Sequence, residues 1–322
     1  MGKNQTLQRF KHFGEKVVEH AKKVSIPFFD DVPLYDVALF FWRSIVDGSI
    51  TTRASAIAFS FFIALFPFII FLFTLIPYVP KFIPYIPAEV FQNELFEIIH
   101  QLVPESTFAT IESTVNDIIT RPRGSLLSFG FFAAIIFSTN GLASMMSAFD
   151  ATIHEIKRRS WISQRIAAVY LLVILSVLLT IAISLLIGGQ NLIQYLDNKD
   201  IIRDDFLVVL LTIGKWIVTV SLFFFAYSFL YYFAPAKKRK WRFISAGGSL
   251  ATLLSIVAFY GFTYYINNFS QYNTLYGSIG TLLIILLLMY VMSLILLVGF
   301  ELNASIYQAR SNREEWNDES KD

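Results

Sequence analysis

Long uncharged stretches dominate the pattern of hydrophobic and polar positions along this chain. The longest, from Phe243 to Phe300, runs for 58 residues without Asp, Glu, Lys, Arg or His. A helix of a soluble protein keeps one polar face in water, whereas a helix that spans a bilayer needs about 20 mostly apolar residues. The stretch is too long for one span and has a polar break at 267–273, so it predicts two membrane helices joined by a short hairpin.

The same pattern predicts an all-α, polytopic membrane protein with six transmembrane helices. Each uncharged window exceeds the length of about 18 residues that is typical of a membrane helix, although the fourth carries Lys215. The predicted spans are 54–79, 125–149, 166–188, 206–233, 243–266 and 279–300. A six-helix membrane domain is therefore expected over 54–304, after an N-terminal segment 1–53 and before a charged cytoplasmic tail 305–322.

The positions of Lys and Arg predict the orientation of these spans. With the spans placed as above, 20 of the 26 basic residues lie in the segment 1–53, the loops 150–165 and 235–242, and the tail. The loops on the other side hold five. Because cytoplasmic loops carry the excess of Lys and Arg, both termini are expected in the cytoplasm. The loop 80–124 is then expected outside.

Three segments outside the spans have apolar residues at helical spacing. Residues 7–24 combine such a stripe with lysines, which is typical of a helix that lies on an anionic membrane face. Packing on another cytoplasmic segment is the alternative. Residues 37–46 resemble an interfacial helix that leads into the first span. The outer loop 80–124 has two stripes, which predict two amphipathic helices.

Composition agrees with a membrane protein and narrows the chemistry. The chain has 16% charged residues, against about 25% in soluble domains, and 55% hydrophobic residues. It has no cysteine, which excludes disulfides, thiolate metal ligands and cysteine nucleophiles. The four histidines are scattered, and no catalytic triad, zinc-binding run or phosphate-binding glycine loop is present. We therefore expect no enzyme activity, no cofactor, no metal and no nucleic-acid partner.

Polar and helix-disturbing residues inside the spans are candidates for a substrate path or gate. Thr139, Asn140 and Gly141 lie near the middle of the second span. They could break that helix and line a cavity, or Asn140 could hydrogen-bond a neighbouring helix. Pro67 lies midway along the first span, where it removes a backbone hydrogen bond and produces either a static bend or a hinge.

Charged and amide groups near the span ends are further candidates. Glu301 ends the sixth span and is followed by Asn303, while Arg53 and Asp150 are expected at the same cytoplasmic edge. Because a carboxylate within a bilayer is costly, Glu301 is expected either to pair with a cation or to serve in gating or proton coupling. The predicted pair is Arg53–Glu301 or Arg53–Asp150. Lys215 is expected either to extend to the outer headgroups or to attract an anionic headgroup.

Several segments carry a specific combination of residue types. They are the small residues and proline of 53–67, the tyrosine–proline–basic–tryptophan–glycine sequence of 231–248, and the blocks 275–280 and 299–304 around the sixth span. Together these resemble the YihY/BrkB family of bacterial inner-membrane proteins, long mislabelled as ribonuclease BN. The resemblance covers residues 35–310 and implies a six-helix membrane fold, without a settled biochemical activity. Asp150 stands where many relatives carry Asn.

These features lead us to expect a multi-pass protein of the bacterial inner membrane that acts as a transporter or flippase. Its substrate would be amphiphilic or anionic, such as a lipid or a cell-envelope precursor. The sequence has no ATP-binding motif, so transport would be passive, ion-coupled or dependent on a partner. Membrane lipids and a second copy or an envelope protein are the expected partners. The alternative is a non-catalytic membrane scaffold or envelope-integrity factor, and ribonuclease activity is not expected.

Overall fold

The structure is a computed structural model of the chain. It describes residues 24–25, 29, 32–75, 93, 96–97, 112, 124–152, 160–198, 205–235, 242–269 and 278–319. Within these ranges the secondary structure is helical, and the helices are α2 (Leu34–Asp47), α3 (Ile50–Leu75), α7 (Gly124–Asp150), α8 (Trp161–Asn198), α9 (Asp205–Phe233), α10 (Ala246–Phe269) and α12 (Ser278–Glu319). The predicted helix at 7–24 and nearly all of the loop 80–124 lie outside the described residues.

The predicted polytopic membrane fold is confirmed. Five helices are long and apolar enough to cross a membrane, over Ser128–Asp150, Trp161–Leu179, Trp216–Phe233, Ala246–Tyr265 and Leu282–Glu314. The helices Leu34–Asp47 and Ile50–Leu65 together are also long and apolar enough, and they make a sixth span if the bent pair is counted as a single span. These helices overlap the predicted windows because a continuous helix satisfies every backbone polar group without water.

The last helix differs most from the predicted range. α12 is 42 residues long and continues about five turns beyond the predicted end of the span at residue 300. It therefore takes in most of the segment 305–322. The extension is polar, and an exposed ion pair between Arg310 and Glu314, at 2.9 Å and one turn apart, stabilises it as a helix.

A sharp turn joins α2 to α3, and the two helices are bent by 67°. Gly48 ends α2, and Ser49 follows with a φ of 49°, in the left-handed region. A Cβ atom at Gly48 would lie 2.1 Å from the Ser44 carbonyl oxygen, so the turn requires glycine. As a result α2 lies across the end of the span, with Trp42 exposed on one face and Val37 buried on the other.

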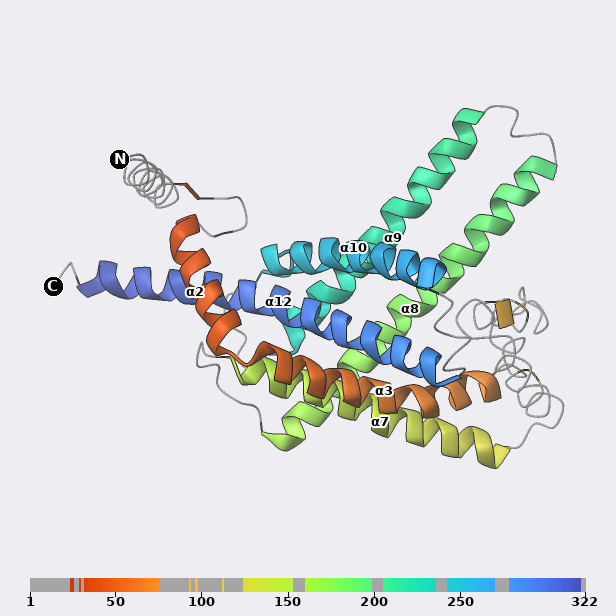
Figure 1. Cartoon of the computed structure of the whole chain (residues 1–322), viewed down its shortest axis with the longest axis horizontal. Helices are drawn as coiled ribbons and strands as arrows, with labels where there is room; N and C mark the ends of the chain where they lie inside the picture. Colours follow the sequence, from red (N-terminus) through yellow and green to blue (C-terminus); the bar gives the residue numbers. More distant parts are fainter. Residues whose placement is uncertain are drawn as a thin grey trace, which may run out of the picture.

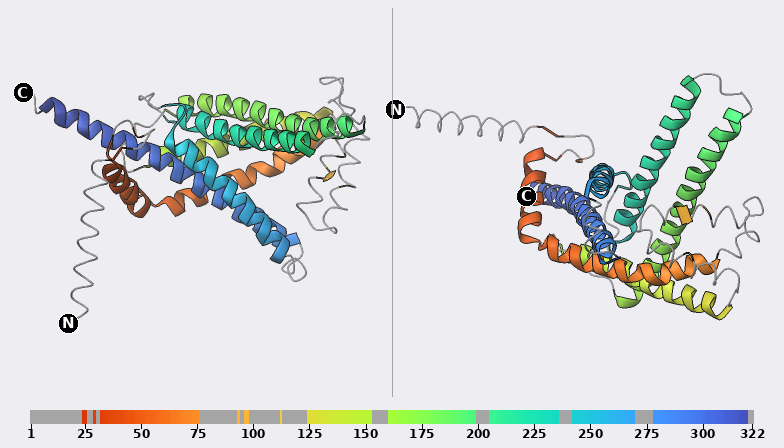
Figure 2. Two further views of the ribbon diagram at one scale, coloured as in Figure 1. Left: turned by 90° about the horizontal axis from the view of Figure 1, so that it is seen from above. Right: turned by 45° about the vertical axis from the view of Figure 1, so that its right-hand side comes forward.

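The six long helices form a ring in sequence order. Each packs against the helix that precedes it and the helix that follows it, and α12 closes the ring by packing on α3. In Figure 1 α3, α7 and α12 run alongside one another, while α8 and α9 diverge from them toward the upper right. Figure 2 shows α8 and α9 as an antiparallel pair and α10 beside α12.

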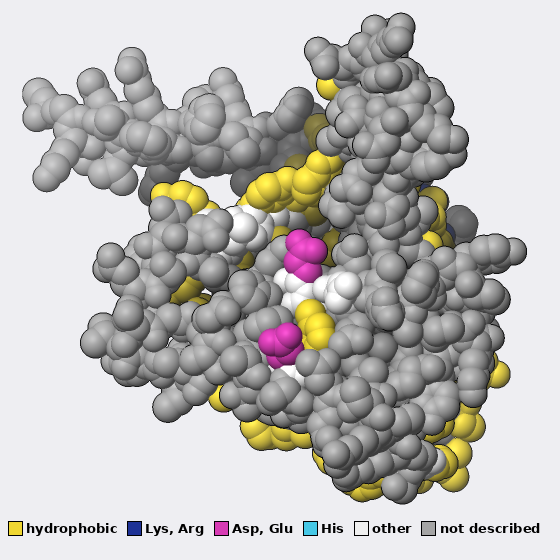
Figure 3. Space-filling view, turned by 90° about the vertical axis from the view of Figure 1, so that its right-hand side faces the viewer, with side chains coloured by type: hydrophobic (Ala, Val, Ile, Leu, Met, Phe, Trp, Pro, Cys, Tyr) yellow, Lys and Arg dark blue, Asp and Glu magenta, His cyan; other side chains and the backbone are white. Residues whose placement is uncertain are grey.

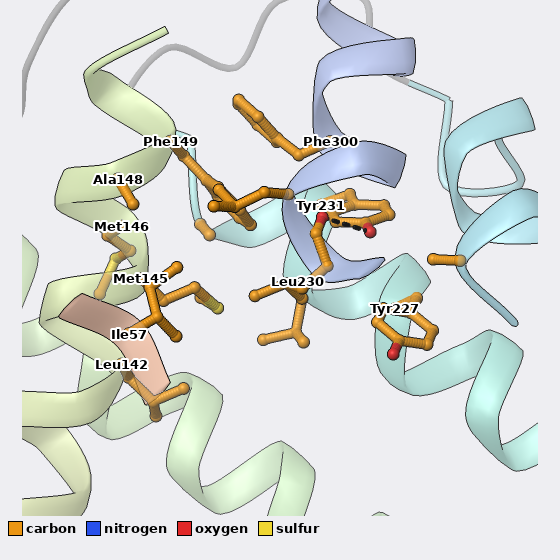
Figure 4. Close-up of a cluster of buried hydrophobic side chains, with 14 of the residues drawn as sticks. Ile57, Leu142, Met145, Met146, Ala148, Phe149, Tyr227, Leu230, Tyr231 and Phe300 are labelled. Atoms are coloured by element: carbon orange, nitrogen blue, oxygen red, sulfur yellow. Dashed lines mark hydrogen bonds between the residues drawn. The ribbon is translucent and has the colours of Figure 1, made fainter. Parts of the chain in front are cut away.

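Buried side chains are concentrated at one end of this ring, which we call the packed end. Every buried side chain described in α9 lies at or after Tyr227, in α10 at or before Ser255, and in α12 at or after Ser293. Because successive helices are antiparallel, these parts come together. The rings of Phe149 and Phe300 stack there with centroids 3.9 Å apart (Figure 4). Toward the opposite end, which we call the far end, α8 and α9 diverge from the other helices (Figure 1), and many side chains there lie outside the described ones.

Small residues bring α10 and α12 close together at the packed end. A Cβ atom at Gly247 would lie 2.0 Å from the Gly299 carbonyl oxygen, and one at Gly299 would lie 2.4 Å from the Tyr231 hydroxyl. That hydroxyl donates a hydrogen bond to the Leu296 carbonyl at 2.8 Å (Figure 4). Because Gly247 and Gly299 have no side chains, the backbones of α10 and α12 can contact each other directly.

Candidate functional site

A buried carboxylate, that of Glu301 in α12, is the centre of the candidate site. Its side chain has no exposed surface. It accepts hydrogen bonds from the hydroxyl of Ser44 in α2, from Nη2 of Arg53 in α3 at 2.6 Å, and from the hydroxyl of Thr152 at 2.7 Å. A buried charge is costly unless it is paired and hydrogen-bonded, and these three donors meet that requirement. We call these four side chains the Glu301 cluster.

Arg53 supplies the positive charge of the cluster and ties α3 to α7. Its side chain is only 9% exposed, and its Nη1 donates to the carbonyl oxygen of Ala148 at 2.8 Å. The turn after α2 covers it, since a Cβ atom at Gly48 would lie 3.0 Å from Nη2. The predicted ion pair between Arg53 and Glu301 is therefore confirmed, and it joins the two helices that close the ring.

The burial of Glu301 was not part of the expectation, whereas its place at the cytoplasmic edge of a span stays a prediction. It is fully enclosed by protein, so hydrogen-bond donors rather than interfacial water stabilise its charge. Asp150, the other predicted partner of Arg53, ends α7 and is partly buried. Its role in a path or gate stays a prediction.

Asn303 joins α12 to the start of α10. Its Oδ1 accepts a hydrogen bond from the Gly247 N–H at 2.8 Å, and its Nδ2 donates to the Ser245 hydroxyl at 2.9 Å. The same hydroxyl accepts from the Gly248 N–H at 3.2 Å and so caps the helix. Asn303 and Ser245 thus satisfy N–H groups that the first turn of a helix leaves without intrahelical partners.

Of the two alternatives for the second span, the break is wrong, because α7 is continuous from Gly124 to Asp150, and the hydrogen bond of Asn140 to a neighbouring helix is confirmed. An unbroken helix keeps its backbone hydrogen bonds satisfied in lipid. Asn140 instead contacts α8, where its Oδ1 accepts a hydrogen bond from Nη1 of Arg165. The Thr139 hydroxyl donates to the Ile135 carbonyl of its own helix at 2.7 Å. A Cβ atom at Gly141 would lie 2.9 Å from the Phe61 ring of α3, so this residue serves close helix packing.

Two further candidates lie within helices that are continuous at their positions. Pro67 is within α3 and Lys215 is within α9. Both side chains lie outside the described ones, so the hinge at Pro67 and the headgroup contact of Lys215 stay predictions. The bend that the structure describes lies between α2 and α3.

The structure adds three polar residues that sequence reasoning does not single out. Ser44 and Thr152 are isolated hydroxyl residues without a local signal, and only the fold brings them to Glu301. Arg165 contributes to the positive charge of the loop 150–165, but it also lies inside the apolar span Trp161–Leu179. That position is the signal that could have identified it, since charges within spans are expensive.

The Glu301 cluster can hold segments of the chain together. In the described part of the chain, no group of three or more His, Asp or Glu side chains is placed to hold a metal ion. The Glu301 cluster is an ion pair with hydroxyl donors, buried among apolar side chains. Such an ion pair holds the segments together strongly, because separating its partners leaves an unpaired charge in the protein interior.

Comparisons with known proteins place the chain in a family. The profile described as "Virulence factor BrkB" matches residues 41–322. The chain belongs to the BrkB family. It is 27% identical over 223 residues to YfkH of Bacillus subtilis, a protein named as ribonuclease-like, covering 69% of this chain and 81% of YfkH. No solved structure matches the chain.

Two further relatives of this BrkB-family protein are named UPF0761 membrane proteins. The one from Idiomarina loihiensis is 24% identical over 234 residues, which cover 69% of this chain and 78% of the relative. The one from Vibrio campbellii is 31% identical over 105 residues, which cover 33% and 32%. The predicted family is therefore confirmed, as is a multi-pass bacterial membrane protein.

Proposed function

We propose that this BrkB-family protein moves an amphiphilic or anionic substrate, such as a lipid or a cell-envelope precursor, across the membrane. It does so without catalysing a reaction. The observation that carries the proposal is the ring of six long helices, whose described buried side chains are concentrated at one end. A path that is closed at one face and approached from the other is what an alternating-access transporter requires.

The Glu301 cluster is suited to be the gate of this path. The excess of Lys and Arg in the segments at the packed end favours a cytoplasmic location for it. The cluster joins α2, α3 and α12 to the segment after α7, so loss of the contacts to Glu301 would release several elements together. In this proposal the intact cluster is the closed state of the cytoplasmic side.

The described side chains toward the far end favour an amphiphilic substrate. Figure 3 looks at this end, and most of the described side chains that are visible there are hydrophobic, with acidic groups between them. Exposed apolar residues such as Phe132 in α7, Ile217 in α9 and Tyr264 in α10 lie toward the same end. Apolar side chains of this kind contact acyl chains, both of the surrounding bilayer and of a lipid-like substrate.

The experiment is a translocation assay with the full chain reconstituted in lipid vesicles. Labelled lipids with neutral, zwitterionic and anionic headgroups and a polyprenyl-phosphate precursor analogue are followed from one leaflet to the other. We expect movement of at least one of them, slowed at least about tenfold by Glu301→Gln, because without its charge pair the cytoplasmic side cannot return to the closed state that alternating access requires. Glu314→Gln is the matched control, because it makes the same change in the exposed pair of the same helix.

Two results would count against the proposal. One is a wild-type protein that moves none of these substrates, and the other is a Glu301→Gln protein that moves them at the wild-type rate. Because Glu301→Gln could also impair folding, Thr152→Val provides a milder variant that removes one donor to the same carboxylate. A smaller change in rate with Thr152→Val, in protein that remains folded at the assay temperature, separates gating from misfolding.

A membrane scaffold is the second candidate, and the length of α12 favours it. The C-terminal part of this helix extends beyond the ends of the other long helices (Figure 1). A rigid polar helix at that place could recruit a partner. Deletion of residues 311–322 would then abolish the capture of that partner, while Glu301→Gln would leave it unchanged.

A further inference from the structure

We infer that Arg165 binds the phosphate group of an anionic phospholipid on the lipid-facing surface of α7 and α8. This goes beyond the proposed transport, because it concerns a lipid that stays bound to the outside of the ring. The site consists of Arg165, Trp161, Asn140 and the apolar residues beside them, and we call it the Arg165 site.

The charge of Arg165 is not neutralised by the described part of the protein. Its Nη1 donates to the side-chain oxygen of Asn140, which is a neutral amide. Among the described residues the ion pairs are those of Arg53 with Glu301 and of Arg310 with Glu314. A guanidinium group has five N–H donors, so Arg165 has donors left for a ligand. A phosphate group offers the charge and the acceptor geometry that they require.

An aromatic side chain places Arg165 at the level of the headgroups. The guanidinium carbon of Arg165 lies 5.5 Å from the ring centre of Trp161, one turn earlier in α8. The tryptophan is 70% exposed. Exposed tryptophans of membrane proteins prefer the interface between headgroups and acyl chains, and the contact itself favours a cation there.

Apolar residues continue from Arg165 toward the middle of the span on both helices. Val169 lies one turn after Arg165 in α8, and Ile136 and Phe137 lie one turn before Asn140 in α7. All three are exposed. Because α7 and α8 are antiparallel, both steps lead in the same direction, away from the packed end. A charged position with an apolar surface beneath it matches a phospholipid, with its headgroup at Arg165 and an acyl chain along the two helices.

Two other features favour a fixed anionic lipid. Gln164 holds the start of α8 to α7, since its Nε2 donates to the Ala143 carbonyl and to the Ser147 hydroxyl, each at 2.8 Å. The site therefore does not have to be assembled when the lipid binds. The sequence Lys157-Arg158-Arg159 precedes α8, and basic residues next to a span attract anionic lipids of the cytoplasmic leaflet.

The test measures lipid retention by the purified full-length protein in detergent. Native mass spectrometry counts bound phosphatidylglycerol and bound phosphatidylcholine at equal added concentrations. We expect the wild type to prefer phosphatidylglycerol, and Arg165→Gln to weaken its binding about tenfold, as expected for loss of hydrogen bonds to a charged group. Trp161→Leu should weaken it about two- to fivefold, because it removes only the aromatic cover.

Arg43→Gln is the matched control, because Arg43 is an exposed cation of α2 outside the site. It should leave the preference for phosphatidylglycerol unchanged. Equal loss in the Arg43→Gln and Arg165→Gln proteins would mean attraction by net charge alone and would overturn the inference. Wild-type retention by both Arg165→Gln and Trp161→Leu would overturn it as well. If Arg165→Gln does not fold, the Trp161→Leu result decides.

Discussion

Arg53 and Arg165 show how one residue type meets two environments within the same ring of helices. Arg53 is buried, and its guanidinium group meets a carboxylate and a backbone carbonyl. Arg165 is partly exposed, and its guanidinium group meets an amide oxygen and an exposed tryptophan. The first charge is neutralised by the protein, whereas the second meets no carboxylate among the described residues. Position in the fold, rather than residue type, decides which arginine holds helices together and which is free to bind a ligand.

Because of this difference, we expect mutations at the two sites to change different properties of the protein. Removing one partner of a buried ion pair leaves an uncompensated charge in the interior and costs stability. Removing a cation at the lipid surface leaves the protein packing nearly intact. We therefore expect loss of stability at the Glu301 cluster and loss of lipid binding at the Arg165 site.

The largest effect is expected for Glu301→Ala. It leaves Arg53 buried without its carboxylate, which should lower the free energy of unfolding by about 3–5 kcal/mol. Chemical unfolding of the full chain in mixed detergent micelles measures this. The control Glu314→Gln affects an exposed pair and should change stability by less than about 1 kcal/mol. Equal effects of the two changes would show that the cluster does not hold the packed end together.

A somewhat smaller effect is expected for Gly247→Ala, where α10 approaches α12. The added Cβ atom would lie 2.0 Å from the Gly299 carbonyl oxygen, so the helices must separate, at a cost of about 1–3 kcal/mol. Gly261→Ala is the control in the same helix, since nothing lies within 4 Å of its Cβ position. That control should stabilise the helix slightly. Thermal melting of both variants compares them directly, and destabilisation by both would contradict the close-approach explanation.

Thr152→Val should have a moderate effect on the same cluster. It removes one hydroxyl donor to Glu301 but leaves Arg53 and Ser44 in place. We expect a loss of about 1 kcal/mol, the usual net contribution of one hydrogen bond. Chemical unfolding measures it, and in the double variant Thr152→Val/Glu301→Ala the effect of Thr152→Val should disappear. Full additivity of the two changes would mean that Thr152 acts elsewhere.

The smallest change in intrinsic stability is expected for Arg165→Gln. The glutamine keeps a polar group near Asn140, and the site is at the surface, so stability without added lipid should change by about 0.5 kcal/mol or less. Added phosphatidylglycerol should raise the melting temperature of the wild type but not of this variant, because a ligand stabilises the state that it binds. A large loss of stability without lipid would instead identify Arg165 as a packing residue like Arg53.

Local sequence was sufficient to predict the membrane helices and one contact between them. Hydropathy is a property of a continuous stretch, so the windows that end near Phe149 and Phe300 could be recognised without knowledge of their neighbours. The pair between Arg53 and Glu301 was predictable because opposite charges at the same end of a bundle must find partners. Its burial was not, since depth depends on which side chains cover the pair.

The effect of Asn140–Gly141 on α7 shows where local reasoning fails. Asn and Gly are weak helix formers, which suggests a break. The helix nevertheless continues, because lipid penalises every unpaired backbone group and because Phe61 and Arg165 pack against these positions. The partners of these two residues come from α3 and α8, so no window of α7 alone contains them.

The amino-acid chain alone therefore determined that this is a helical membrane protein of the BrkB family, with most of its basic residues in a few segments outside the uncharged windows and with an acid and an arginine that pair. Only the tertiary structure decided that Ser44 and Thr152 complete the surroundings of Glu301, that Asn140 meets Arg165, and that the helices pack at one end. The physical reason is the distance along the chain over which each interaction acts. Solvation by lipid acts on each segment independently, whereas hydrogen bonds and close packing form between residues that are up to 257 positions apart.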